Sequence, residues 1–197
     1  MTLRDIAAVV GIRHASLYHH APGGKEQLFI EVTERNLQRH ADGLRRQYSG
    51  AEPGVRAQLQ AIAHWLLTNP PMDLVRMTHS DLPAIEKGEA ERLAQLVLHS
   101  LIEPVIEVLR QAQARGEIEH TDLGLVGGGV VGLVESLHAI PSEVLTISRV
   151  AMADVLIDVL LYGLLSGESR RANAATMSTP SAPEPHQRET VTPSYKK

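Results

Sequence analysis

Apolar residues recur every three or four positions through most of this chain, which is the period of a helix with one buried face. The pattern is clearest from residue 25 to 48, and again from residue 55 to the Pro70-Pro71 pair. The two stripes consist of Leu37, Ala41, Leu44 and Tyr48, and of Val55, Leu59, Ile62 and Leu66. The pattern predicts an all-α fold with one helix over each stretch.

The same period continues downstream, with Pro and Gly marking the ends of helices. We expect a short helix from Met72 to about His79 and a long one from Glu89 to Arg115. Pro104 should kink or divide the long helix, because proline cannot donate the backbone hydrogen bond of a helix interior. Two further helices are expected at 122–140 and 144–165.

These last two helices are apolar nearly all round. The first contains Gly127-Gly128-Gly129, and each glycine costs a helix roughly 1 kcal/mol against alanine, so we expect a close backbone approach there. Two such helices cannot both be buried within one subunit of 197 residues. We therefore expect a homodimer, with helices 122–140 and 144–165 of both subunits forming a four-helix bundle.

The first residues of the chain predict two short helices separated by a tight turn. Thr2 and Asp5 are spaced as in a capping box, and Gly11 stands where a left-handed residue commonly ends a helix. Residues 13–20 then make about two helical turns, in which Leu17 points inward. The exposed positions are those of His14, Ser16, Tyr18 and His19. This layout predicts a helix-turn-helix, whose second helix enters the major groove of DNA and contacts base edges.

Short motifs in this region resemble the DNA-binding sequence of the tetracycline-repressor (TetR) family. They are Thr2-x-Arg4-Asp5-Ile6-Ala7, Gly11-Ile12, Ser16-Leu17-Tyr18-His19-His20 and Gly24-Lys25-Glu26-x-Leu28. The resemblance is specific over these residues and beyond them rests on the helical architecture. It implies a dimeric, all-helical, ligand-responsive transcription regulator. The expected parts are a DNA-binding region with its connecting helix at 1–48, a ligand-binding and dimerisation domain at 49–165, and a disordered tail at 166–197 whose composition lacks any period.

The resemblance also implies roles for single residues. Thr2, Tyr18 and Lys25 match positions that contact DNA phosphates. The positions that face the bases are matched by Arg13, His14, Ser16 and His19. Histidine and serine specify bases weakly, so the operator sequence does not follow from these residues.

The chain departs from the family pattern in three ways. Ala21 replaces a usual aromatic residue, residues 22–24 lengthen the link to Lys25 by one, and the family's first helix is absent before Thr2. Without that helix we expect partial exposure of Ile6, Val10 and Leu17, while Ile12 is expected in the core. Either the true chain begins upstream of Met1, or the DNA-binding region is a reduced one supported by the helix that starts at Lys25.

Charge and composition agree with a regulator that contacts DNA locally. The net charge is −4, yet residues 1–48 carry seven Lys and Arg against five Asp and Glu. A mildly basic end on an acidic chain favours local phosphate contacts over non-specific DNA binding by the rest. The chain opens without a basic and apolar leader, and its most apolar segment, 155–165, is far short of a bilayer span. We expect a soluble, cytoplasmic protein that does not enter the membrane.

The candidate chemistry is sparse. The ten histidines are scattered without metal-ligand spacing, and cysteine is absent, so we expect no metal site and no cofactor. No nucleophile elbow, phosphate loop or dinucleotide fingerprint appears in the sequence. The sequence therefore predicts that the protein is not an enzyme.

An effector pocket is expected among the helices between residues 55 and 115, where the resembled family holds its ligand. A single tryptophan and several methionines suit an adaptable apolar cavity. The residues that we expect to line it are His64, Trp65, Met72, Met77, His79, His99 and Ile102. For each of them alone, ordinary core packing is an equally good interpretation. The effector would be a small, largely apolar molecule.

Two functional hypotheses follow. The first is a TetR-like regulator, most often a repressor, released by a small-molecule effector from a pseudo-palindromic operator in double-stranded DNA. The second is a dimeric helical protein that binds small molecules and whose DNA binding is impaired or vestigial.

Overall fold

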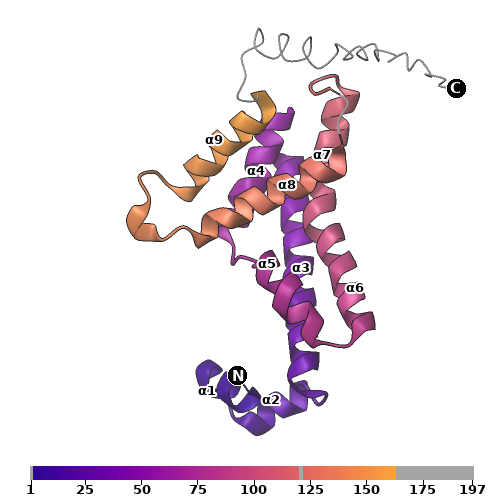
Figure 1. Ribbon diagram of the computed structural model, residues 1–197, viewed down its shortest axis with the longest axis vertical. Helices are drawn as coiled ribbons and strands as arrows, with labels where there is room; N and C mark the ends of the chain where they lie inside the picture. Colours follow the sequence, from indigo (N-terminus) through magenta and orange to yellow (C-terminus); the bar gives the residue numbers. More distant parts are fainter. Residues whose placement is uncertain (1, 120–121, 163–197) are drawn as a thin grey trace, which may run out of the picture. The chain divides into compact units, whose positions relative to one another are not determined.

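The computed structural model describes residues 2–119 and 122–162, and every regular element in these ranges is helical (Figure 1). The N-terminal elements are α1 (Leu3–Val10), α2 (His14–His20) and the long α3 (Gly24–Gly50). The middle of the chain forms α4 (Val55–Thr68), α5 (Leu74–Arg76), the π-helical turn η1 (Met77–Asp81), η2 (Leu82–Ala84), α6 (Lys87–Val97), the π-helical turn η3 (Leu98–Ile102) and α7 (Glu103–Ala114). The last described elements are α8 (Leu123–Ser136), η4 (Leu137–Ala139), η5 (Ser142–Val144) and α9 (Arg149–Tyr162). The all-α prediction is confirmed.

The long α3 forms the axis on which the other helices pack. It runs from the pair α1 and α2 into the body, where α4, α6 and α7 lie along it (Figure 1). Its predicted stripe is buried, since Leu37 and Leu44 are fully shielded from solvent. Leu59, Ile62 and Leu66 of α4 pack into the same core.

Pro104 divides the predicted long helix, as expected. The proline occupies the first turn of α7, directly after the π-helical turn η3. Because proline lacks an N–H, the helix cannot continue its regular hydrogen bonds through this point, and the wider turn before it accommodates the break. The expected helix over 89–115 is therefore α6, η3 and α7 in series.

The C-terminal helix begins later than predicted. Residues 137–148 connect α8 to α9 with the two 3₁₀ turns η4 and η5, so the expected start at residue 144 is corrected to Arg149. The Ser148 hydroxyl accepts a hydrogen bond from the Ala151 amide at 3.1 Å and starts α9. Arg149 donates to the carbonyls of Leu137 and Ile140. These hydrogen bonds fix the connection in a non-helical path, which the apolar pattern alone does not reveal.

One of the three consecutive glycines in α8 lies against a neighbouring helix. A Cβ at Gly127 would lie 2.9 Å from Cγ1 of Ile106, so this glycine allows the expected close approach of α8 to α7. Gly128 and Gly129 face no described atom within 4 Å. The close approach is thus confirmed within the chain for Gly127. The predicted tail at 166–197 lies outside the described residues.

Within the described part of the chain, no helix is both long and apolar enough to cross a membrane.

Candidate DNA interface and junction pocket

The helix-turn-helix is built by local hydrogen bonds that the sequence predicts. Thr2 and Asp5 form a complete capping box, in which the Thr2 amide donates to the Asp5 carboxylate at 2.6 Å and the Asp5 amide donates to the Thr2 hydroxyl at 3.3 Å. The hydrogen bond from the Thr2 amide, and then the Thr2 side chain, favour the charged carboxylate and lower the pKa of Asp5. Gly11 adopts a left-handed φ of 74° and ends α1. Both predicted features of α1 are confirmed.

The second helix presents a polar face. Leu17 is buried, and Ala21 just after the helix is fully buried, so these two residues hold α2 against its neighbours. The residues assigned to base contact, Arg13, His14, Ser16 and His19, are all exposed. Tyr18, assigned to a phosphate, is 54% exposed. Among the described residues, this side of α2 is therefore accessible to the groove of a DNA duplex.

The apolar residues around α1 differ in part from the expectation. Val10 is 62% exposed and Ile6 is half-buried, in line with the partial exposure expected for these two residues. Leu17, in contrast, is only 7% exposed, on a helix that packs against α1. Ile12 is 41% exposed and does not enter the core. The sequence pattern could not reveal this, since Ile12 lies in the turn, where helical periodicity gives no direction.

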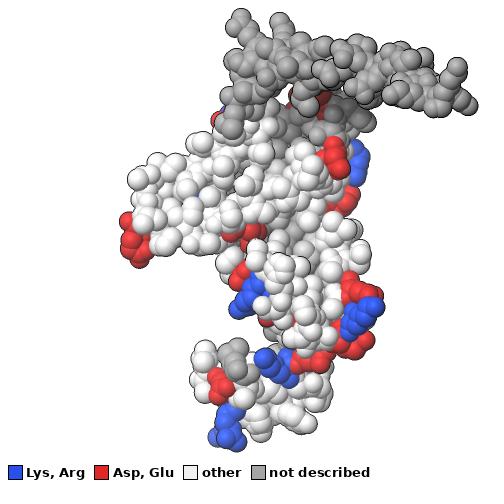
Figure 2. All heavy atoms as spheres, viewed as in Figure 1, with Lys and Arg blue, Asp and Glu red and all other residues white. Residues whose placement is uncertain are grey.

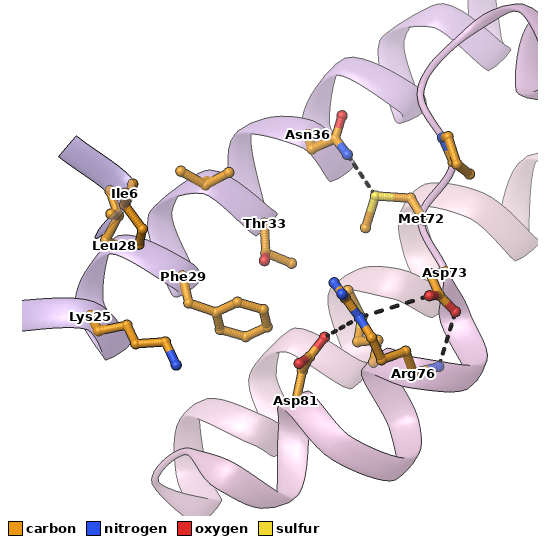
Figure 3. Close-up of a pocket in the computed structure, with 13 residues that line it drawn as sticks. Ile6, Lys25, Leu28, Phe29, Thr33, Asn36, Met72, Asp73, Arg76 and Asp81 are labelled. Atoms are coloured by element: carbon orange, nitrogen blue, oxygen red, sulfur yellow. Dashed lines mark hydrogen bonds and ion pairs between the residues drawn. The ribbon is translucent and has the colours of Figure 1, made fainter. Parts of the chain in front are cut away.

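Lys25 lies in the first turn of α3 and faces the body of the molecule. Its side chain extends into the space between α3 and the segment that carries Asp81 (Figure 3). No hydrogen bond or ion pair of its ammonium group is present among the described residues. Figure 2 shows Lys and Arg side chains near the helix-turn-helix. The surface over α8 and α9 on the same face of the molecule carries few charges. Lys25 thus adds a positive charge beside the helix-turn-helix, close to Glu26 and Asp81.

A pocket of about 380 Å³ lies at the junction of the helix-turn-helix and the body (Figure 3). Its walls come from α1, from the first half of α3, and from the segment that leads from α4 into η1. Its apolar lining consists of Ile6, Leu28, Phe29, Val32, Pro71, Met72 and Met77. An apolar cavity of this size is suited to a small organic molecule.

The polar groups of the pocket largely satisfy one another. Arg76 lies between two carboxylates, with its Nε 3.3 Å from Asp81 and 3.8 Å from Asp73. Asn36 donates from Nδ2 to the sulfur of Met72 at 2.8 Å. Asp73 adopts a φ of 24°, a conformation disfavoured for a non-glycine residue, and its carboxylate accepts from the Arg76 amide. Two positive and two negative side chains leave the pocket without a strong preference for a charged ligand.

Of the predicted pocket residues, the structure brings only Met72 and Met77 to this cavity. His64 instead binds Asp154 of α9, with Nε2 and Oδ1 2.8 Å apart. The Trp65 ring packs against Gly43 of α3. The remaining three residues lie elsewhere, on the exposed surface or under α8: His79, His99 and Ile102. The structure therefore does not bring the seven predicted residues together in one ligand site.

Sequence reasoning missed the contribution of α3 to this cavity. Leu28, Phe29 and Val32 precede the stripe that begins at Leu37, and they lie on α3 where it passes between α1 and η1. The available signal was the only phenylalanine of the chain, placed in an apolar cluster beside the DNA-binding motif.

The chain shares its fold with solved structures of other proteins. No family model and no curated protein matches the chain in sequence. Among solved structures, the TetR family transcriptional regulator PfmR from Thermus thermophilus is similar with a TM-score of 0.65 and 20% identity, over 84% of this chain and 90% of that one. The fatty acid degradation regulator FadR from Bacillus halodurans is similar with a TM-score of 0.66 and 18% identity, over 83% and 89% of the two chains. A protein of unknown function from a Rhodococcus species gives 0.61 and 22%, over 84% and 86%.

Proposed function

We propose that this chain, which has a TetR-like fold, is a DNA-binding transcriptional regulator. We further propose that it acts as a repressor, which a small-molecule effector releases from its operator. The observation that carries the proposal is the exposed polar face of α2, held in place by the buried Leu17 and the capped α1. Such a helix, short and polar on its outer side, fits the major groove. We propose a cytoplasmic location for this regulator.

The DNA contacts divide into two classes. Tyr18, Lys25 and Thr2 are proposed to bind phosphates, and these contacts position the helix without reading sequence. The base edges are left to Arg13, His14, Ser16 and His19, which share exposure on or beside α2. Phosphate contacts of this kind make the affinity strongly dependent on salt.

The regulator is proposed to act as a homodimer through α8 and α9. Leu125 and Leu133 of α8 are 75% and 39% exposed, and Val155 and Leu160 of α9 are 56% and 43% exposed. Isolated exposed apolar residues are common, but this many on two adjacent helices favour a protein partner. A two-fold dimer would present two copies of α2 to half-sites about one helical turn of DNA apart.

The effector is proposed to bind in the junction pocket as a small, largely apolar molecule. A ligand there would contact α1 and α3 on one side and the Pro71–Asp81 segment on the other. It can release DNA only by binding more tightly to the conformer whose two α2 helices no longer match the operator. The location between the two parts supports such a difference in affinity.

The test is binding of the chain to a fluorescent duplex from its own upstream promoter, followed by anisotropy at several salt concentrations. We expect specific binding with steep salt dependence, and a loss of at least tenfold for Tyr18→Ala across all sequences. His79→Ala, which removes an exposed ring from η1, outside α2 and outside the proposed dimer helices, is the control and should bind DNA as the unmodified chain does. Absence of specific binding would favour the alternative, a dimeric small-molecule-binding protein, a hypothesis that the exposed Val10 beside α2 also motivates.

A further inference from the structure

A row of arginines follows the outer side of α3 through the second half of this helix. Arg35, Arg39 and Arg46 are four and seven residues apart, so they share one face of a helix with 3.6 residues per turn. All three are exposed, and the side chain of Arg35 is 83% exposed. The opposite face carries Leu37 and Leu44, which are fully buried in the body. The arginine row, defined by Arg35, Arg39 and Arg46, therefore lies on the solvent side of α3.

The arginine row differs from the other arginines of the body in its lack of fixed counter-ions. Every described arginine after α3 binds a carboxylate or backbone carbonyls: Arg56, Arg76, Arg92, Arg110, Arg115 and Arg149. Arg39 and Arg46, in contrast, have no ion pair or hydrogen bond within the described part of the chain. Arg35 has one contact of 3.6 Å with Glu31 on its own helix. The row thus presents positive charge that the chain itself leaves uncompensated.

The surface around the arginine row is polar throughout. From Arg35 to Ser49, every exposed side chain of α3 is polar. Asp42, which stands between Arg39 and Arg46 in the sequence, accepts a hydrogen bond from Gln38 at 3.1 Å. Protein interfaces commonly have an apolar or aromatic centre, which this surface lacks. It therefore fits a partner that is bound through charge alone.

The length of the row favours a DNA backbone over an acidic protein segment. From Arg35 to Arg46 the helix axis rises by about 16 Å, at about 1.5 Å per residue. A DNA duplex carries one negative charge per about 1.7 Å of its axis, and so roughly nine over this length, of which about half face one side. An extended acidic peptide rises about 3.3 Å per residue and turns alternate side chains away, so it offers only two or three carboxylates. Guanidinium groups also match phosphate oxygens with paired hydrogen bonds.

We propose that the arginine row binds the phosphate backbone of a second DNA duplex, distinct from the duplex that α2 enters. α3 leads from the helix-turn-helix into the body (Figure 1), and Arg35 lies about 15 Å further along its axis than Lys25. A duplex on Arg39 and Arg46 is therefore displaced from the operator at α2. Its binding is independent of sequence, because the contacts involve phosphates and no base edges. The row lets a chain on its operator hold another DNA segment, and it goes beyond the proposed operator binding without requiring it.

The experiment uses the full chain with the cations of the helix-turn-helix removed, Arg4→Gln/Arg13→Gln/Lys25→Gln. Its binding to a fluorescent duplex of random sequence is followed by anisotropy over a salt series. We expect salt-dependent binding to persist in this background. Addition of Arg39→Gln and Arg46→Gln should weaken it at least tenfold. The slope of log K against log salt should fall by about 1.8, since each of the two phosphate contacts contributes roughly 0.9.

The matched control adds Arg110→Gln and Arg115→Gln instead, which remove the same charge from arginines paired with carboxylates, and should leave the binding unchanged. Circular dichroism verifies that each variant keeps its helices. No binding in the chain that lacks the helix-turn-helix cations, or equal binding with and without Arg39 and Arg46, would overturn the proposal.

A competition experiment separates DNA from an acidic protein as the partner. Polyglutamate with the same number of charges as the duplex should bind at least tenfold more weakly than the duplex. Equal or tighter binding of polyglutamate would assign the row to an acidic protein and overturn the proposal. Binding of the Arg39→Gln/Arg46→Gln chain to its promoter duplex is measured separately, so that failure of the arginine row is distinguished from failure of the proposed operator binding.

Discussion

Gly43 is a residue whose purpose is visible only in the folded chain. It lies inside α3, where glycine is unfavourable, but a Cβ there would overlap Cζ2 of Trp65 on α4. The missing side chain allows the indole ring to lie directly on the α3 backbone. Trp65 thus contributes to the packing of α3 on α4, the two helices that form the centre of the body.

We expect Gly43→Ala to destabilise the protein by about 1–3 kcal/mol, because the new methyl group overlaps a ring that has little room to move. The gain in helix propensity of about 1 kcal/mol offsets only part of this cost. Urea unfolding followed by circular dichroism measures the change. Gly50→Ala, at an open position in the last turn of α3, should be neutral or stabilising, and equal effects at the two sites would refute the role of Trp65 contact.

His40 makes stability depend on pH. It is fully buried on α3, and burial, aided by the nearby charge of Arg39, lowers the pKa of its imidazole below the ordinary 6.5. A lowered pKa in the folded state means that the unfolded chain binds the proton first. The contribution of neutral His40 is therefore present above pH 6.5 and is lost as the pH falls from 6.5 through the folded pKa.

We expect the free energy of unfolding to decrease as the pH falls from about 7.5 to about 5, and the decrease to be smaller in His40→Leu. Urea titrations at several pH values measure it. His79→Leu, a change at an exposed histidine, serves as the control and should keep the pH dependence of the unmodified chain. An identical pH profile in His40→Leu would show that this imidazole is not the source.

Among the elements, α4 and α9 form a pair fixed by charged side chains. Asp154 of α9 lies 2.8 Å from His64, and Asp158 of α9 lies 2.6 Å from Arg56 of α4. The Arg56 guanidinium also stands over the Tyr162 ring at 4.8 Å. These contacts leave the apolar residues Val155 and Leu160 on the outside of α9. The helix thus packs on the body through the buried Ala153 and Ile157 as well as these polar contacts, and it exposes apolar residues that the proposed dimer would cover.

The glycines of α8 lead to a prediction for the proposed dimer. A side chain at Gly128 meets no described atom of its own subunit within 4 Å, so Gly128→Leu should be tolerated by the isolated fold. In a dimer packed through α8 the same side chain would stand between the subunits and weaken their association. Light scattering should show a shift toward the monomer mass, with Gly50→Leu as a control at an open position. A normal dimer mass for Gly128→Leu would exclude close packing at this glycine.

Across the whole described unit, Lys25 connects the proposed DNA interface with the junction pocket. Lys25 lies beside the helix-turn-helix, and its side chain lines the junction pocket together with Phe29 and Asp81. A ligand in the pocket would therefore touch a residue proposed to bind a DNA phosphate. This position supports competition between effector and DNA for the same side chain.

We expect Lys25→Ala to weaken DNA binding for all sequences and to flatten its salt dependence. Each phosphate contact contributes roughly 0.9 to the slope of log K against log salt, so loss of one lysine per subunit should reduce the slope of a dimer by about 1.8. Fluorescence anisotropy over a salt series measures the slope. Arg110→Ala on α7, at the end of the body far from α2 (Figure 1), is the control, and an unchanged slope in Lys25→Ala would remove this residue from the interface.

The local features of this protein were determined by its sequence. The capping box of Thr2 and Asp5, the end of α1 at Gly11, the stripe of α3 and the break at Pro104 all depend on residues within a few positions of one another. Backbone hydrogen bonding and side-chain periodicity act over that range, so the pattern alone predicted the helices and their order. The spacing of Thr2, Gly11 and Leu17 also predicted the helix-turn-helix, and the short motifs added the resemblance to the TetR family.

The assembly of the pockets depended on contacts between distant parts of the chain. Phe29 and Met77 line one cavity although they lie far apart in the sequence, and Met72 binds both Asn36 and Glu135. The late start of α9 depends likewise on Arg149 reaching back to the carbonyls of Leu137 and Ile140. A periodic pattern shows which face of a helix is apolar but not which helix covers it. The tertiary packing therefore decided that His64 binds Asp154 of α9 and that the Glu135 carboxylate accepts from the Met72 amide.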